Sequence, residues 1–284
     1  MYLNEILVRL IERGVVALPA DVERALASAH GKERGRIAKS QLALILKNID
    51  LAKKSRIPIC QDTGVPVFYV KIGRRCDHVF ETERELATAV RIATEKSILR
   101  PNIVDPLTRR NSNNNTGKGM PVIHYELFDG NHIEITYSPK GAGTENMSEL
   151  WMLQPGADLK EIEQLVLGKV KDMGGRPCPP YILGIGIGGT SERCLELAKK
   201  ASMRNLEEKN GDWKLARLEK ALLKKINKTG IGPMGLGGDT TCLAVNIGVA
   251  DCHTATMPLA VAVSCWADRR AKVVLRKHGH TWVD

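Results

Sequence analysis

The chain has 284 residues, 43% of them hydrophobic, and a formal net charge of +10 at pH 7. No apolar run approaches the ~20 residues that span a bilayer, which argues against a membrane protein. A positive charge can attract nucleic acid, but three Phe, five Tyr and four Trp leave few rings for base stacking. We therefore expect a globular protein with neither a nucleic-acid partner nor a membrane partner.

The segment from residue 1 to about residue 55 predicts a helical lead-in. Leu3, Ile6, Leu7 and Leu10 fall on one helical face, and the theme continues after Gly35 with Leu42, Leu44, Ile45 and Ile49. The start of the chain, MYLNEILVRLIERGV, mixes acidic with apolar residues and has no small-residue cleavage site. This pattern is typical of an amphipathic helix and not of a signal peptide, so we expect a cytoplasmic protein.

The segments that follow alternate between strand and helix patterns. Residues 65–72 (VPVFYVKI) predict a strand, and residues 81–99 a helix. Val122–Leu127 and His132–Tyr137 alternate apolar and polar residues around Asp129-Gly130, which predicts an antiparallel hairpin. Further helices are expected at 158–173, 192–205 and 213–228, and further strands at 181–187, 243–250 and 259–264. The expected fold class is α/β (mixed α+β), with a mixed β-sheet flanked by helices in one domain over residues 1–284.

Seven cysteines in a chain with no export signal argue against a disulfide framework, and the odd count strengthens that argument. Cys60, Cys178 and Cys265 stand beside turn residues or charges, in PICQDTG, GRPCPPY and VSCWADRR. The other four, Cys76, Cys194, Cys242 and Cys252, are interpreted as ordinary core cysteines, because free cysteine is commonly buried. Without a CxxC pair or a Cys/His cluster, a closed zinc site is not expected.

A glycine-rich segment offers a rival function. Residues 184–189 (GIGIGG) match GxGxxG between a short strand and a helix, and Glu207 and Glu208 follow at the distance of a ribose-binding carboxylate. This pattern would suit an NAD-binding dehydrogenase. Against it, Pro179 and Pro180 crowd the start of the strand, and the stretch around Glu207 is polar. The alternative interpretation is a turn that lets a strand and a helix pack closely.

Motifs in order along nearly the whole chain resemble one enzyme family. They are CQDTG (60–64), NTGKGMP (115–121), KGAGTENMS (140–148), CPPYILGIGIGGTSE (178–192) and GPMGLGG (232–238). Together they resemble the class I, iron-sulfur-dependent fumarate hydratases and the related L(+)-tartrate dehydratases. The resemblance implies an iron-sulfur hydro-lyase domain that holds a 4Fe-4S cluster.

The resemblance also implies which residues serve the site. Cys60, Cys178 and Cys265 would be the three cluster ligands, and Cys242 and Cys252 compete for the third place. Gln61, Asp62, Arg100 and the Gly143 backbone would contact the substrate, with Asp62 as a catalytic proton donor or shuttle. Other roles for these residues are an Asx turn for Asp62 and a surface ion pair for Arg100.

The resemblance implies a partner as well. Single-chain members of the family carry a second domain, so this chain resembles the alpha subunit of the two-subunit form. We expect a hetero-oligomer with a separate beta subunit that supplies the second half of the active site. The expected substrate is a small dicarboxylate, with reversible hydration of fumarate to (S)-malate as the first interpretation. L(+)-tartrate dehydration is the alternative, and a methylated substrate such as mesaconate stays open.

Overall fold

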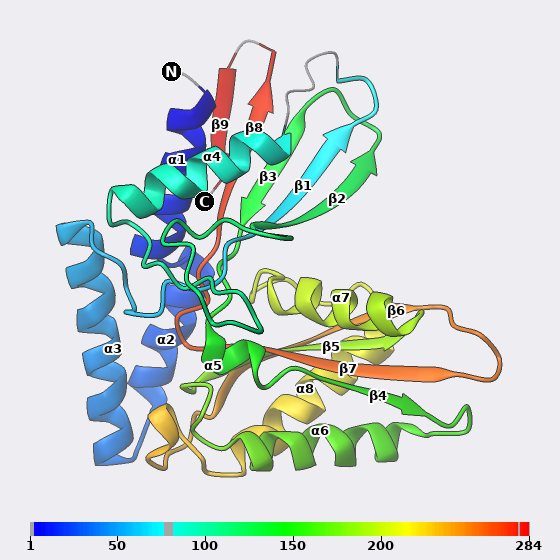
Figure 1. Cartoon of the computed structure of the whole chain (residues 1–284). Coiled ribbons are helices and arrows are strands. Elements are labelled where there is room, and N and C mark those ends of the chain that lie inside the picture. Colours follow the sequence, from blue (N-terminus) through cyan, green and yellow to red (C-terminus); the bar gives the residue numbers. More distant parts are fainter. Residues whose placement is uncertain (1–2, 77–81, 278, 284) are drawn as a thin grey trace. The chain divides into compact units, whose positions relative to one another are not determined.

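The computed structural model describes residues 3–76, 82–277 and 279–283 (Figure 1). The chain divides into two compact units. Unit 1 comprises Met1–Pro19, Asn48–Ala142 and Arg269–Asp284, and unit 2 comprises Ala20–Lys47 and Gly143–Asp268. The expected mixed α/β class is confirmed, with N-terminal helices and two mixed sheets flanked by helices. The assignment of residues 1–284 to a single domain stays a prediction.

Unit 1 is built on a five-stranded sheet in the order β2-β1-β3-β8-β9. These strands are β1 (Val67–Gly73), β2 (Val122–Phe128), β3 (Ile133–Tyr137), β8 (Ala271–Arg276) and β9 (Gly279–Val283). Helices α1 (Leu3–Val16) and α4 (Thr82–Glu95) pack on one face of the sheet and form the core with it (Figure 1). The predicted face of α1 is confirmed, because Ile6, Leu7 and Leu10 are buried.

The expected hairpin between β2 and β3 is wrong, because β1 lies between them. β1 pairs with β2 in parallel and with β3 antiparallel. Val67–Val70 at the start of β1 are buried on both faces, so this strand takes a central place, whereas the half-exposed β2 lies at the edge. The Asp129-Gly130 turn closes around the end of β1, where Arg75 N–H donates to Gly130 C=O at 2.9 Å. The local turn signal was real, but it joins strands that are not neighbours.

Unit 2 is built on a four-stranded sheet in the order β4-β7-β5-β6. Its strands are β4 (Glu149–Leu153), β5 (Tyr181–Gly188), β6 (Cys242–Ala250) and β7 (Met257–Ser264). α7 (Ser191–Ser202) covers one face of the sheet, and α6 (Leu159–Met173) and α8 (Trp213–Asn227) cover the other (Figure 1). Asp158 and Asp212 begin α6 and α8 as N-caps, since their side chains accept bonds from Glu161 N–H and Lys214 N–H at 2.8 Å each.

The remaining elements complete the order along the chain. They are α2 (Ala20–Lys32), α3 (Arg36–Ser55), the short α5 (Ala142–Glu145) and the 3-10 helix η1 (Pro233–Gly235). α3 begins in unit 2 and ends in unit 1. Strands β4, β8 and β9 were not predicted from the sequence. None of the described helices is long and apolar enough to cross a membrane.

The glycine pattern at 184–189 lies mostly inside β5, with Gly184, Gly186 and Gly188 as strand residues. A Cβ on Gly184 would stand 2.0 Å from the carbonyl oxygen of Ala198, and one on Gly186 would stand 2.0 Å from that of Cys194. The glycines therefore let the backbone of α7 approach the strand closely. A dinucleotide site needs such glycines in the turn after the strand, so the geometry favours the packing interpretation over the NAD-binding one.

A side chain at Gly186 should therefore destabilise unit 2. We expect Gly186→Ala to lower the free energy of unfolding by about 3 kcal/mol, because the added methyl overlaps backbone atoms that cannot move independently. Gly168→Ala is the matched control, since Gly168 lies in α6 with no atom near its Cβ position. This control should gain about 0.5–1 kcal/mol from the higher helix propensity of alanine. Urea unfolding measures both, and equal stabilities would contradict the packing role of Gly186.

Candidate functional site

Asp62 organises the Cys60–Gly64 loop of unit 1. Its Oδ1 accepts a hydrogen bond from Gly64 N–H at 2.9 Å, and its Oδ2 accepts one from Ala142 N–H at 2.8 Å. The first bond closes an Asx turn, which is the structural role that the sequence offered for this residue. The second bond ties the loop to the first residue of α5. The carboxylate is thus held in place while both oxygens keep further lone pairs.

A buried arginine, Arg269, holds the same loop by a hydrogen bond to its backbone. Arg269 is only 4% exposed, and its Nη1 donates to the carbonyl oxygen of Asp62 at 2.9 Å. The carbonyl of Arg269 in turn accepts from Ser138 Oγ at 3.5 Å. Arg269 belongs to the CWADRR segment, four residues after Cys265, and sequence reasoning assigned it no role. The main chain and the side chain of Asp62 are therefore both fixed.

Arg100 combines a fixed backbone with an exposed side chain. Its N–H donates to Thr63 Oγ1 at 3.0 Å, and its carbonyl accepts from Asn115 Nδ2 at 2.8 Å. Among the residues that the structure describes, the guanidinium has no hydrogen bond or ion pair, so the alternative role of Arg100 in a surface ion pair is not seen there. Within unit 1 the structure thus brings the backbone of Arg100 to the loop that carries Gln61 and Asp62. The Gln61 side chain is exposed.

Unit 2 gathers a second group of predicted site residues at one end of its sheet. β5 and β7 are antiparallel, with Ile182 opposite Ser264, so the residues just before β5 and just after β7 emerge together. Cys178 precedes β5 and Cys265 follows β7, and Trp266 N–H donates to the carbonyl of Cys178 at 3.2 Å. The strand register therefore places these two cysteines in neighbouring segments.

Two glycine-rich segments of unit 2 lie beside Cys178. The Gly232–Gly238 loop leads into β6, which is parallel to β5, and Met234 N–H donates to the carbonyl of Pro179 at 2.8 Å. Gly143 is exposed, and a Cβ on it would stand 3.5 Å from the carbonyl oxygen of Arg176. The Gly143 backbone therefore lies near the chain that leads to Cys178.

The three predicted cluster ligands share a similar environment. Cys60, Cys178 and Cys265 are half-buried and form no disulfide. Cys178 has a left-handed backbone, with φ of 53°. Cys60 belongs to unit 1, and Cys178 and Cys265 belong to unit 2. Over residues 3–76, 82–277 and 279–283, no three Cys, His, Asp or Glu side chains form a group that could hold a metal ion. The ligand set thus stays a prediction.

The remaining cysteines differ in their access to a metal. Cys194 and Cys242 are buried, and their thiols donate to the carbonyls of Gly186 at 3.2 Å and Ala244 at 3.0 Å. Burial raises the pKa of Cys194 to about 11 and that of Cys242 to about 12, so both stay protonated near neutral pH. Cys242 is therefore a poor competitor for the third ligand position. Cys252 is exposed, so its expected burial is wrong, because it lies in the turn after β6.

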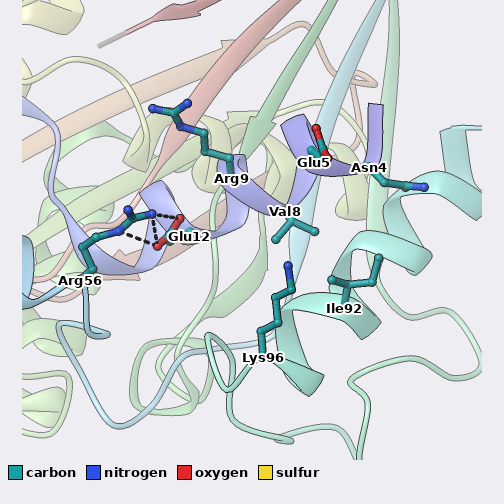
Figure 2. Close-up of a pocket in the computed structure, with 8 residues that line it drawn as sticks. All are labelled: Asn4, Glu5, Val8, Arg9, Glu12, Arg56, Ile92 and Lys96. Carbon is teal, nitrogen blue, oxygen red and sulfur yellow. Dashed lines mark hydrogen bonds and ion pairs between the residues drawn. The ribbon is translucent and has the colours of Figure 1, made fainter. Parts of the chain in front are cut away.

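Unit 1 also contains a cavity of about 430 Å³. It is lined by Asn4, Glu5, Val8, Arg9, Glu12, Arg56, Ile92 and Lys96. Figure 2 shows Arg56 and Glu12 paired at one end of it, with two atom contacts at 2.7 Å and one at 3.0 Å. This cavity contains none of the predicted site residues.

Comparisons with known proteins agree along almost the whole chain. The family model described as fumarate hydratase (Fumerase) matches residues 4–274. A protein of Methanocaldococcus jannaschii, provisionally named L(+)-tartrate dehydratase subunit alpha, is 46% identical over 95% of this chain and 96% of its own length. The L(+)-tartrate dehydratase subunit alpha of Escherichia coli K12 is 30% identical over 96% of this chain and 90% of its own length. A Geobacillus stearothermophilus protein, provisionally named fumarate hydratase class I, is 35% identical, and the chain spans only 54% of its length.

The environments of the cysteines predict a pattern of chemical labelling. In the folded protein at pH 8, we expect iodoacetamide to modify Cys252 readily and to leave Cys194 and Cys242 unmodified, because their thiols are buried and protonated. All three should react at similar rates in concentrated urea, which is the internal control. Mass spectrometry of peptides measures the modified fraction at each site. Native labelling of Cys242 as fast as that of Cys252 would contradict the burial described above.

Proposed function

Because the chain belongs to the fumarate hydratase (Fumerase) family, we propose that it is the alpha subunit of a two-subunit hydro-lyase acting on a small dicarboxylic acid. The observation that carries this proposal is the match to the Methanocaldococcus jannaschii subunit over nearly the full length of both chains. The chain also corresponds to about half of the Geobacillus stearothermophilus protein that is provisionally named fumarate hydratase class I. A separate beta subunit would then supply the remaining half of the active site.

The names of the relatives give more support to L(+)-tartrate as the substrate than to fumarate. Two relatives that match this chain over most of their own length are named as subunits of L(+)-tartrate dehydratase. The CWADRR segment also resembles the tartrate enzymes more closely. Hydration of fumarate to (S)-malate is the second candidate, favoured by KGAGTENMS and IGIGGTSE and by the Geobacillus stearothermophilus relative. Both reactions interconvert a hydroxylated acid and its dehydrated product.

The cofactor of this proposed enzyme is a 4Fe-4S cluster held by Cys60, Cys178 and Cys265. The donor set fits such a group, because clusters take thiolate ligands and these three cysteines are neither sealed in a core nor joined in disulfides. When bound, a cluster with only three protein ligands supplies an open iron that acts as a Lewis acid on a substrate oxygen.

The chain's own residues would bind and orient the substrate. Arg100 presents an exposed guanidinium, whose planar fork matches a carboxylate. Asp62 would hold or transfer a proton at Oδ1 or Oδ2, which the amides of Gly64 and Ala142 keep in position. The exposed amide of Gln61 would donate to a substrate oxygen, and the Gly143 backbone would line the pocket.

Replacing the proposed ligands tests the cluster assignment. We expect the anaerobically reconstituted chain to bind about four irons and four sulfides, and Cys60→Ser, Cys178→Ser and Cys265→Ser each to lose most of them. Cys252→Ser is the matched control and should keep the full iron content. Iron and sulfide analysis with the visible absorbance spectrum gives the answer. A cluster that survives Cys265→Ser but not Cys252→Ser would identify Cys252, and not Cys265, as the third ligand.

Activity should require the second subunit. We expect the complex with the beta subunit of the same organism to turn over a dicarboxylate, and the cluster-loaded alpha chain alone to keep less than ~1% of that rate, since half of the contacts to the transition state would be missing. The kcat/KM values for L(+)-tartrate and for fumarate, measured on one preparation, decide between the two substrates. Appreciable turnover by the alpha chain alone, or NAD-dependent oxidation by the complex, would contradict the proposal.

A further inference from the structure

We propose that Thr63 and Asn115 are positioning residues that fix the backbone of Arg100 beside the Cys60–Gly64 loop. The proposal rests on the proposed function, because it takes Arg100 as the residue that binds a substrate carboxylate. Neither Thr63 nor Asn115 would touch the substrate. Both would act through Arg100 by holding the main chain on which its guanidinium stands.

Thr63 provides the first contact. Its side chain is only 1% exposed, and Oγ1 accepts hydrogen bonds from Arg100 N–H at 3.0 Å and from Asn102 Nδ2 at 3.2 Å. One hydroxyl therefore holds the segment on both sides of Pro101. Because Thr63 follows Asp62 directly, the same short loop fixes the proposed proton carrier and the proposed carboxylate clamp.

Asn115 provides the second contact and is fully buried. Its Oδ1 accepts from Asn102 N–H at 2.7 Å and from Ile103 N–H at 3.3 Å. Its Nδ2 donates to Thr94 Oγ1 at 2.9 Å and to the carbonyl of Arg100 at 2.8 Å. The four bonds use both donors of the amide and two acceptor sites of its oxygen. With φ of 59°, the residue also adopts a left-handed backbone that asparagine tolerates better than most residues.

Together the two side chains fix the N–H and the C=O of Arg100 while its guanidinium stays exposed. A carboxylate that binds there need not pay for ordering this stretch of backbone, because its position is already set. Loss of either contact should therefore weaken substrate binding without removing a group that touches the substrate. This effect distinguishes a positioning role from a contribution to stability alone.

Thr63→Val tests the first contact, because valine keeps the shape and removes the acceptor. In the alpha–beta complex we expect a KM about ten-fold higher and a similar loss of affinity for succinate, an unreactive dicarboxylate, because the hydrogen bonds from Arg100 and Asn102 to Thr63 are lost. Thr63→Ser should restore both values to within about three-fold, because it returns the hydroxyl. Thr229→Val, which removes a hydroxyl that donates to Ile226 C=O at 2.6 Å, is the stability control and should leave KM unchanged.

A double-mutant cycle decides whether Thr63 acts through Arg100. With Arg100→Ala already in place, Thr63→Val should raise KM by less than about two-fold, because the side chain that it positions is gone. A full ten-fold effect in both backgrounds, or a lower melting temperature with unchanged KM and succinate affinity, would overturn the proposal. Turnover by the unmodified complex is established first, so that failure of the proposed function is seen separately. If Thr63→Val does not fold, Thr63→Ala replaces it in the same cycle.

Discussion

Peptide groups outside helices and strands need hydrogen-bond partners, and in unit 1 a few side chains supply them. The loops at Cys60–Gly64 and Arg100–Ile103 have no strand ladder beside them. The Asp62 carboxylate, the Thr63 hydroxyl and the Asn115 amide together accept or donate bonds to five backbone N–H groups and one carbonyl. These three polar side chains thus hold the backbone of this part of the candidate site. Removing any one of them leaves backbone groups unpaired.

In unit 2 the β-sheet, and not single side chains, places the predicted site residues. Cys178 and Cys265 lie in neighbouring segments because β5 and β7 run antiparallel in a defined register. The Gly232–Gly238 loop lies at the same end of the sheet because β6 runs parallel to β5. α7 packs closely against the glycines of the same strand, β5. A strand pattern that resembled a nucleotide loop therefore serves the candidate site indirectly, by fixing the strand whose start follows Cys178.

The sequence was informative where a signal is local. Amphipathic spacing located α1 and α6, and continuous apolar runs located β5 and β7. The Asp129-Gly130 signal gave the right turn but the wrong pairing, because the choice of neighbour depends on the burial of β1, more than 50 residues earlier. Recognition of motifs pointed to Asp62 and Arg100, but it gave no role to the residues that hold them, although Thr63 and Asn115 lie within the motifs. Thr63 and Arg100 are separated by 37 residues, and Asp62 and Arg269 by 207, so no local pattern could join them.

These two ways of placing residues differ in how they respond to mutation. Strand register is shared among many backbone bonds, so replacing the sulfur of Cys178 or Cys265 should leave the pairing of β5 with β7 intact. The position of the Arg100 backbone instead depends on single side chains, because Thr63 Oγ1 accepts from two donors and the Asn115 side chain makes four hydrogen bonds. Loss of metal binding in a cysteine variant can therefore be attributed to the missing ligand. Loss of substrate affinity in unit 1, by contrast, must be separated from loss of stability, because there the same hydrogen bonds support both.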